Sequence, residues 1–188
     1  IGFVGFGKIA RTMLPKAKAF GLRAIAYDSF LPPEEITKHG VEPVDFDQLL
    51  READFISLHT PSTKETYHMF GAEEFKKMKP TAYLINTARG AVVDEAALYE
   101  AVSKDIIAGA GLDVLEKEQP PDPDNPLFKL DNVIITPHIG SYSETAYWDL
   151  RKTPVEEVAR ILQNKWPIYL VNPDVKEKYT KKWGVVMS

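Results

Sequence analysis

The sequence contains no cysteine, and this absence excludes several kinds of site. Disulfide scaffolds, cysteine-ligated zinc centres and thiol nucleophiles all need cysteine, so none of them operates within these 188 residues. The sequence also lacks an apolar run near the ~20 residues that a membrane-spanning helix needs. No basic segment precedes an apolar stretch at the start, and we therefore expect a cytoplasmic protein with no membrane partner.

The sequence has little charge imbalance and no low-complexity block. Its 23 basic and 27 acidic side chains give a net charge of -4, which lacks the electropositive surface that nucleic-acid binding requires. We predict neither a nucleic-acid partner nor a metal site. Hydrophobic residues make up 44% of the chain, a proportion typical of a globular domain with a sizeable core.

Short apolar runs alternate with segments of helical periodicity along most of the chain. Strands are expected at 1–5, 22–27, 41–44, 55–58, 82–85, 107–112 and 133–135. Helices are expected at 9–20, 33–38, 45–53, 72–78 and 94–104. Most strands are apolar throughout, which is typical of a parallel sheet covered by helices on both faces. The fold class predicted is α/β, a Rossmann-type doubly wound sheet.

Two further segments differ from this alternation. Residues 116–126 contain four prolines and are expected to form a loop. Residues 143–164 are expected to form one long helix, interrupted near Pro154.

A glycine motif follows the first expected strand and opens the first helix. Gly5 suits the tight turn, Gly7 lets the backbone approach a pyrophosphate, and Ala10 permits close packing of helix on strand. The helix N-terminus then presents free N–H groups to phosphate oxygens. A motif of this kind alone is weak evidence, but its position between strand and helix predicts dinucleotide binding.

An acidic residue stands where such a domain recognises the adenosine ribose. Asp28 ends the second strand, 18 residues after Ala10, and its carboxylate would repel a 2′-phosphate. NAD is therefore favoured over NADP, although Arg23 and Lys38 leave NADP open. The alternative for Asp28 is a purely structural role, capping the turn before Ser29.

Three stretches place reactive groups where later strands run into loops. They are INTARGAVVDE at 85–95, GLDVLEKEQP at 111–120 and ITPHIGS at 135–141. Ligands of open α/β sheets bind outside the carboxyl ends of the strands, so these loops are expected to meet at one site.

With these motifs the chain resembles the NAD-binding domain of the D-isomer-specific 2-hydroxyacid dehydrogenases over about residues 1–170. Tyr142, Ser143 and Glu144 also resemble the C-terminal-binding-protein and phosphoglycerate dehydrogenase-like branch, although Ser141 stands where the corepressors have tryptophan. The resemblance implies an NAD-dependent enzyme that interconverts a D-2-hydroxy acid and a 2-keto acid. An NAD(H)-sensing interaction protein with little turnover is the alternative.

The resemblance assigns roles to three residues as catalytic. Arg89 would clamp the substrate's carboxylate and carbonyl oxygen, His138 would act as the acid/base, and Glu118 would orient the histidine and hold its proton. Glu116 is the nearby alternative to Glu118, but the family's glutamate stands five residues after the aspartate at 113. The implied cofactor contacts are Gly5, Gly7, Lys8, Ile9, Asp28, His59, Thr60, Pro61, Thr87, Ala88, Arg89, Asp113, His138, Gly140 and Ser141.

The two remaining histidines, His39 and His68, are interpreted as surface or packing residues without a catalytic partner. The resemblance implies an NAD-binding domain over residues 1–142 and, over 143–188, a helix and tail that return to a substrate domain largely absent from this chain. We therefore expect the chain to be part of a longer protein and to be poorly active alone. A small 2-hydroxy or 2-keto acid as substrate and a homodimer through the NAD-binding domain are also implied.

Overall fold

The computed structural model describes residues 1–118 and 120–183, so Gln119 and the last five residues of the expected tail lie outside the described residues. The chain divides into two compact units, Ile1–Gly140 and Ser141–Ser188. This division falls two residues before the expected one, and the return of the second unit to a substrate domain stays a prediction. Within the described part of the chain, no helix is both long and apolar enough to cross a membrane.

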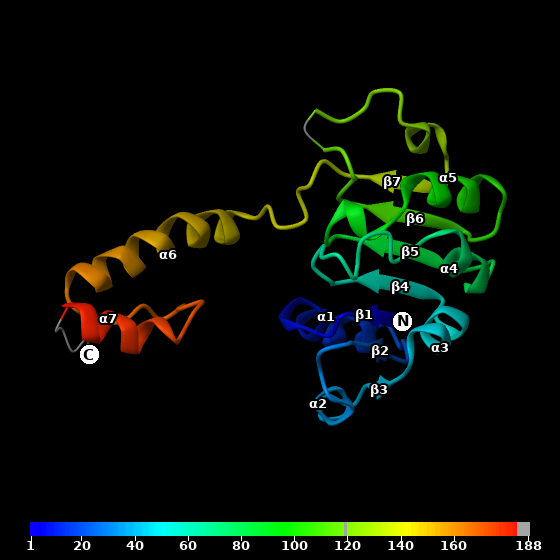
Figure 1. Ribbon diagram of the computed structural model, residues 1–188. Helices are drawn as coiled ribbons and strands as arrows, with labels where there is room; N and C mark the ends of the chain where they lie inside the picture. The colour runs from blue at the N-terminus through cyan, green and yellow to red at the C-terminus, as the bar shows by residue number, and fades with distance from the viewer. Residues whose placement is uncertain (119, 184–188) are drawn as a thin grey trace. The chain divides into compact units, whose positions relative to one another are not determined.

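The first unit is built on a seven-stranded sheet whose neighbouring strands are all parallel, in the order β3-β2-β1-β4-β5-β6-β7 (Figure 1). The strands are β1 (Gly2–Val4), β2 (Ile25–Tyr27), β3 (Glu42–Pro43), β4 (Phe55–Leu58), β5 (Tyr83–Asn86), β6 (Gly109–Leu112) and β7 (Val133–Ile135). The strand order reverses direction between β1 and β4, where doubly wound sheets bind ligands. The predicted fold class is confirmed.

Helices connect the strands at the expected places. The α-helices are α1 (Lys8–Ala19), α2 (Pro33–Thr37), α3 (Phe46–Glu52), α4 (Ala72–Lys77) and α5 (Glu95–Ser103), and the short 3-10 helices are η1 (Gly90–Val92) and η2 (Pro126–Lys129). The Asp45 carboxylate accepts a hydrogen bond from the N–H of Gln48 (2.7 Å) and caps α3.

Strands β2 and β6 begin two or three residues later than expected because the preceding residues close helices. The N–H of Leu22 donates to the Ala17 carbonyl at the end of α1 (3.1 Å), and β2 begins only at Ile25. The N–H of Ile107 likewise donates to the Ala101 carbonyl of α5 (3.2 Å). Apolar composition alone cannot separate a residue that closes a helix from one that starts a strand.

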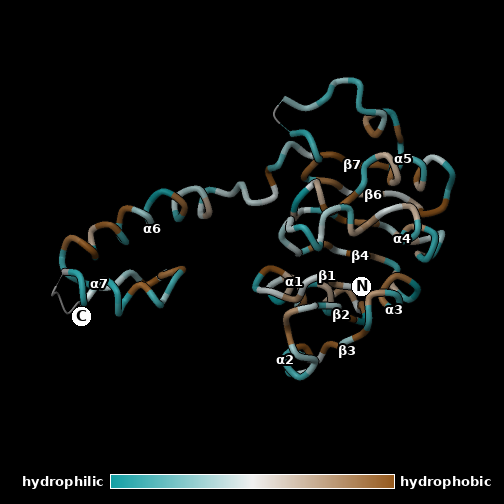
Figure 2. The backbone as a smooth tube through the Cα atoms, in the orientation of Figure 1, coloured by the Kyte–Doolittle hydropathy of each residue, from teal (hydrophilic) through white to brown (hydrophobic). Residues whose placement is uncertain are grey.

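The hydrophobic core has two parts, one on each face of the sheet. Phe3 and Val4 are adjacent in β1 and belong to different parts, because successive side chains of a strand point to opposite faces. Helices α3, α4 and α5 contribute to the larger part, while α1 and α2 contribute to the smaller one. In Figure 2 hydrophobic colours follow the central strands, whereas the long loop after β6 is hydrophilic.

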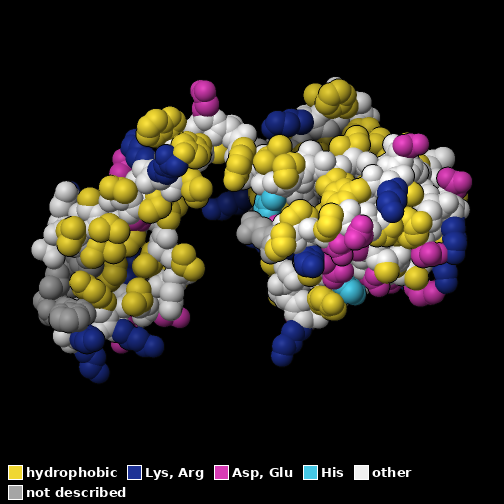
Figure 3. All heavy atoms as spheres, turned by 90° about the horizontal axis from the view of Figure 1, so that it is seen from above, with side chains coloured by type: hydrophobic (Ala, Val, Ile, Leu, Met, Phe, Trp, Pro, Cys, Tyr) yellow, Lys and Arg dark blue, Asp and Glu magenta, His cyan; other side chains and the backbone are white. Residues whose placement is uncertain are grey.

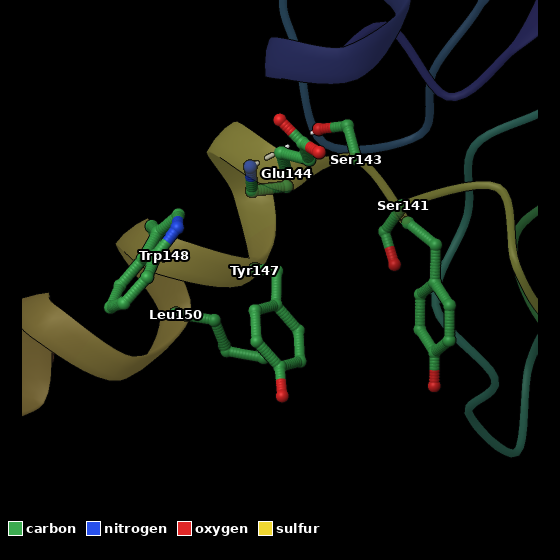
Figure 4. A pocket seen from close by; sticks show the side chains of 8 residues that line it. Ser141, Ser143, Glu144, Tyr147, Trp148 and Leu150 are labelled. Atoms are coloured by element: carbon green, nitrogen blue, oxygen red, sulfur yellow. Dashed lines mark hydrogen bonds between the residues drawn. The ribbon is translucent and has the colours of Figure 1, made fainter.

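The second unit consists of α6 (Glu144–Leu162) and α7 (Val175–Trp183). The Ser143 hydroxyl accepts a hydrogen bond from the N–H of Ala146 and caps α6 (3.1 Å; Figure 4). The expected interruption near Pro154 is wrong, because α6 continues through it. Proline removes one backbone donor, and the other hydrogen bonds of this 19-residue helix remain available to hold it together.

The surface of α6 is unusually apolar for an exposed helix. None of its residues is buried within this unit, and Trp148 and Leu150 are 67% and 76% exposed. Hydrophobic side chains are prominent over the helical unit in Figure 3. At the start of α6, Ser141, Tyr142 and Tyr147 help to line a hollow of about 660 Å³ (Figure 4).

Candidate active site

The residues implicated by sequence gather at one edge of the sheet. Each directly follows a strand or stands three residues after one, and parallel strands end on the same side. In chain order they are Gly5 after β1, Asp28 after β2, His59 after β4, Arg89 after β5, Asp113 after β6 and His138 after β7.

The glycine turn after β1 combines one position that the fold requires to be glycine with one that it does not. Gly5 has φ +85°, and a Cβ there would lie 3.0 Å from the backbone carbonyl carbon of His59. Gly7 has an ordinary φ of -78°, and a Cβ added to it would meet no described atom within 4 Å. The space before α1 is therefore open for a ligand phosphate to approach the backbone, with the side chains of Lys8 and Ile9 exposed beside it.

The Asp28 carboxylate shapes its turn, and Asp28 also lines a cavity beside the glycine turn. Its Oδ1 accepts from the N–H groups of Phe30 (2.8 Å) and Leu31 (3.0 Å), and its Oδ2 accepts from Phe6 of the glycine turn (2.8 Å). Asp28 therefore does cap its turn, which is the structural role considered above as the alternative. A carboxylate offers about four lone-pair sites, so one remains to accept from a ribose hydroxyl.

The two basic residues that left NADP open are engaged elsewhere. Arg23 precedes β2, at the strand end opposite to Asp28, and its guanidinium pairs with Glu42 (2.7 Å) and Glu52 (2.9 Å). Lys38 pairs with Glu35. Both cations have carboxylate partners of their own, and this arrangement favours NAD.

A cavity of about 500 Å³ lies beside the glycine turn, within the size range of ligand pockets. Six predicted cofactor residues line it: Gly5, Gly7, Asp28, His59, Thr60 and Pro61. Sequence reasoning missed the others: Tyr27, Ser29, Phe30, Thr63, Glu65, Thr66 and Met69. Their position in the sequence could have indicated them, since they lie next to Asp28 or within the loop that follows β4.

One buried polar atom in this cavity tests whether the residues present suit a dinucleotide. The Oγ1 atom of Thr60 is buried and has no hydrogen-bond partner among the described residues. Burying a polar atom without a hydrogen bond costs free energy, unless a ligand or a water molecule supplies that bond. With the open glycine turn and the spare acceptor of Asp28, Thr60 makes the cavity suitable for the hydroxyl and phosphate groups of NAD.

His59, which follows β4, is mostly buried and neutral. Its Nε2 lies 3.0 Å from the Ser57 hydroxyl and its ring packs on Phe3. Burial lowers the pKa of His59 from 6.5 to about 4, because desolvation disfavours the charged imidazole.

This burial predicts a pH-dependent stability. The unfolded chain takes up the His59 proton near pH 6.5 and the folded chain only near pH 4, so the stabilisation is complete above pH 6.5 and is lost as the pH falls toward 4. Between pH 7 and 5 the free energy of unfolding should fall by about 2 kcal/mol from this group. Urea unfolding at both pH values measures it. His59→Gln should remove that part of the difference, and an equal pH dependence in this variant would contradict the prediction.

A buried asparagine that sequence reasoning missed shapes the Arg89 turn. The Asn86 side chain, at the end of β5, accepts from the N–H of Ala88 (3.0 Å) and donates to the Arg89 carbonyl (2.9 Å). Thr87 and Arg89 are thereby exposed at the sheet edge. The Arg89 guanidinium donates to the adjacent Ala88 carbonyl (2.6 Å), and among the described residues it has no carboxylate partner. The other N–H groups of its planar fork are available to an anionic ligand.

Asp113 fastens the loop that carries His138. Its carboxylate accepts hydrogen bonds from the Thr136 hydroxyl (2.5 Å) and from the N–H groups of Ile139 (2.9 Å) and Gly140 (2.7 Å). Desolvation alone would raise the pKa of Asp113, but these hydrogen bonds and the nearby His138 lower it. Three acceptor sites are therefore occupied within the protein, and the expected contact with the nicotinamide carboxamide stays a prediction.

Glu118 and His138 meet as a hydrogen-bonded pair. The Nδ1 atom of His138 lies 2.8 Å from Oε2 of Glu118, and His138 has φ +54°. Both residues and Asp113 line a cavity of about 360 Å³. Arg89 is not among its lining residues. Since the carboxylate fixes Nδ1, the Nε2 atom is the one left to exchange a proton with a ligand.

The structure also corrects the interpretation of His68. It was expected to lack a catalytic-type partner, yet its Nε2 lies 2.5 Å from Oε1 of Glu116. The two neighbouring glutamates therefore serve different histidines, Glu116 with His68 and Glu118 with His138. His39 does pack as expected, with its ring in a T-shaped contact with that of Phe6.

A parallel sheet with a glycine turn, an acid directly after the second strand and a histidine–carboxylate pair at its carboxyl edge is typical of a dinucleotide-binding domain of an oxidoreductase. Comparison with known sequences then gives the family. The profile described as "D-isomer specific 2-hydroxyacid dehydrogenase, NAD binding domain" matches residues 1–140. The chain belongs to this family, and the expectation of NAD as cofactor is confirmed at the level of the family.

Individual relatives agree with this assignment. The chain is 49% identical over 175 residues to the glyoxylate reductase of Thermococcus litoralis, covering 93% of this chain and 52% of the relative. It is 44% identical to the D-3-phosphoglycerate dehydrogenase of Archaeoglobus fulgidus, covering 85% of this chain and 30% of that relative. The chain thus spans about half the length, or less, of these relatives.

Solved structures show the same fold. An NAD-complexed D-isomer specific 2-hydroxyacid dehydrogenase from Lactobacillus delbrueckii ssp. bulgaricus has a TM-score of 0.83 and 37% identity, covering 91% of this chain and 55% of that one. A D-lactate dehydrogenase with NAD+ from Lactobacillus jensenii has the same TM-score and 35% identity, with the same coverage.

Proposed function

We propose that the protein reduces a small 2-keto acid to the D-2-hydroxy acid with NADH, and catalyses the reverse oxidation with NAD. The observation that carries this proposal is the 2.8 Å pair of His138 and Glu118 at the sheet edge that also bears the cofactor cavity. A histidine held by a carboxylate, with one nitrogen free, suits proton exchange with an oxygen whose charge changes during the reaction.

The roles follow from the charges that develop. When bound, the reduced cofactor supplies a hydride to the carbonyl carbon, which leaves negative charge on the oxygen. His138 donates the proton from Nε2 to this oxygen, and Glu118 stabilises the cationic imidazole through Nδ1. Arg89 binds the substrate carboxylate and the developing oxyanion through its fork. In oxidation His138 takes the proton back.

The cofactor contacts belong to the same proposal. Asp28 accepts from the adenosine ribose, the turn of Gly5 and Gly7 with Lys8 and Ile9 holds the pyrophosphate, and His59, Thr60 and Pro61 line the adenosine side. Thr87, Ala88, Arg89, Asp113, His138, Gly140 and Ser141 are assigned to the nicotinamide half. The open Gly7 position and the Thr60 hydroxyl, which has no partner among the described residues, support the contacts on the adenosine and pyrophosphate side.

Glyoxylate, the smallest 2-oxo acid, is the substrate that we propose first; its product, glycolate, has no stereocentre, and the D configuration applies to the larger acids. Several relatives at 40–49% identity carry the name glyoxylate reductase, and others carry the name D-3-phosphoglycerate dehydrogenase. The glyoxylate reductases align over 93% of this chain. A homodimer formed through the NAD-binding domain and a cytoplasmic location are proposed on the family resemblance.

The test is NADH oxidation by the full-length natural protein with glyoxylate, hydroxypyruvate, pyruvate and a bulkier 2-keto acid. We expect turnover with glyoxylate above that with the bulkier acid, and slower turnover when NADPH replaces NADH, because the Asp28 carboxylate repels a 2′-phosphate. Tight NADH binding with no turnover of any acid would overturn the proposal and favour an NAD(H)-sensing interaction protein instead.

A further inference from the structure

A second histidine–carboxylate cluster lies apart from the Glu118–His138 pair, and His68 is at its centre. The Nε2 atom of His68 is 2.5 Å from Glu116, and its Nδ1 atom is 3.8 Å from Oδ2 of Asp94. The Tyr67 ring stacks on the imidazole, with ring centroids 4.0 Å apart. These contacts on three sides fix the orientation of a side chain that is only 30% exposed.

The cluster joins two segments, the Arg89 turn and the Glu118 loop, whose relative position matters for the proposed reaction. The backbone N–H of His68 donates to the carbonyl of Ala91 (2.9 Å), two residues after Arg89. Its imidazole reaches Glu116, two residues before Glu118. His68 is therefore tied through its backbone to the arginine turn and through its side chain to the glutamate loop.

The backbone of the glutamate loop is held at the same place. A Cβ added to Gly90 would lie 2.0 Å from the carbonyl of Leu115, so the loop passes directly against the arginine turn. The N–H of Glu116 donates to the Glu95 carboxylate (2.5 Å), which also accepts from Asn125 (2.8 Å). Within the described residues the Glu116 side chain has His68 as its partner.

We propose that His68 is a positioning residue for the reaction. By holding Glu116 while its own backbone is bound to the turn after Arg89, it sets the loop so that Glu118 reaches Nδ1 of His138. His68 lines neither the cavity beside the glycine turn nor the cavity of the Glu118–His138 pair, and it acts through Glu118. This inference rests on the proposed function, since it assigns Glu118 its role.

The experiment is a double-mutant cycle in the full-length natural protein. His68→Phe keeps the ring that stacks on Tyr67 and removes both nitrogens. We expect kcat for keto-acid reduction to fall about 10- to 100-fold, because misplaced catalytic groups are costly, with the Kd for NADH unchanged. In a Glu118→Gln background the same substitution should cause no further loss. His68→Gln, which keeps a donor for Glu116, should retain most of the activity.

The control is Lys76→Met, which removes an exposed ion pair with Glu73 on α4 and should leave kcat unchanged. An equal loss from His68→Phe in both backgrounds would show a merely structural role and overturn the proposal. So would full activity of His68→Phe.

A second measurement separates this proposal from the proposed function. Hydrogen exchange should become faster at the amides of residues 115–118 in His68→Phe, with no change in the strands. If the unaltered protein reduces no keto acid, the proposed function fails. Unchanged exchange in the loop overturns the positioning by His68 whatever the activity, whereas faster exchange supports it when the activity of His68→Phe falls as described above.

Discussion

Replacement of His138 by asparagine is expected to lower kcat for keto-acid reduction by about 10²–10⁴-fold, the range that a positioned general acid contributes. Asparagine removes the nitrogen that carries the exchangeable proton. The loss should be much larger in kcat than in the Kd for NADH, since His138 is one of many proposed cofactor contacts and does not line the cavity beside the glycine turn. Steady-state rates with glyoxylate and fluorescence titration with NADH measure the two quantities.

The matched control is His39→Asn, the same substitution at an exposed histidine without a carboxylate partner among the described residues. It should keep full turnover. A His138→Asn protein that retained its rate would remove this histidine from the mechanism. If the unaltered protein bound NADH but reduced no acid, the Glu118–His138 pair would have to serve something other than proton transfer.

The sequence was sufficient to predict the sheet and the edge where the site lies. The apolar runs that became β1, β4 and β7 are short and continuous, and the glycine turn and Asp28 follow β1 and β2 directly. These are local signals, since each element is specified by neighbouring residues. The pairing of Glu118, rather than Glu116, with His138 was also expected, but from the family resemblance and not from local chemistry.

What the sequence did not predict depends on contacts between distant residues. His68 and Glu116 are 48 residues apart, and no pattern near either one indicates that they meet. Asn86 was passed over because a single asparagine at a strand end is ordinary, and only the fold shows it holding the Arg89 turn. Pro154 shows the opposite error, since a strong local signal was outweighed by the helix around it.

The contact between the arginine turn and the glutamate loop is the most sterically demanding of these distant contacts. Gly90 begins η1 directly after Arg89, and its φ is not positive, so backbone conformation does not explain the glycine. The close approach of the Leu115 segment explains why residue 90 is a glycine. A Cβ would lie 2.0 Å from both the carbonyl carbon and oxygen of Leu115 and 2.5 Å from the nitrogen of Glu116. These are backbone atoms, so the clash can be relieved only if one of the two segments moves.

Gly90→Ala is therefore expected to reduce the free energy of unfolding by about 3 kcal/mol or more, at the upper end of the cost of overpacking. Urea unfolding at pH 7 measures the change. Gly111→Ala is the matched control, because a Cβ on this glycine of β6 would meet no described atom within 4 Å. Gly111→Ala should change the free energy of unfolding by no more than about 1 kcal/mol. Equal effects of the two substitutions would show that the Leu115 segment yields easily. A segment that yields could not keep Glu118 in register with Arg89, so this stability measurement also bears on how the site is built.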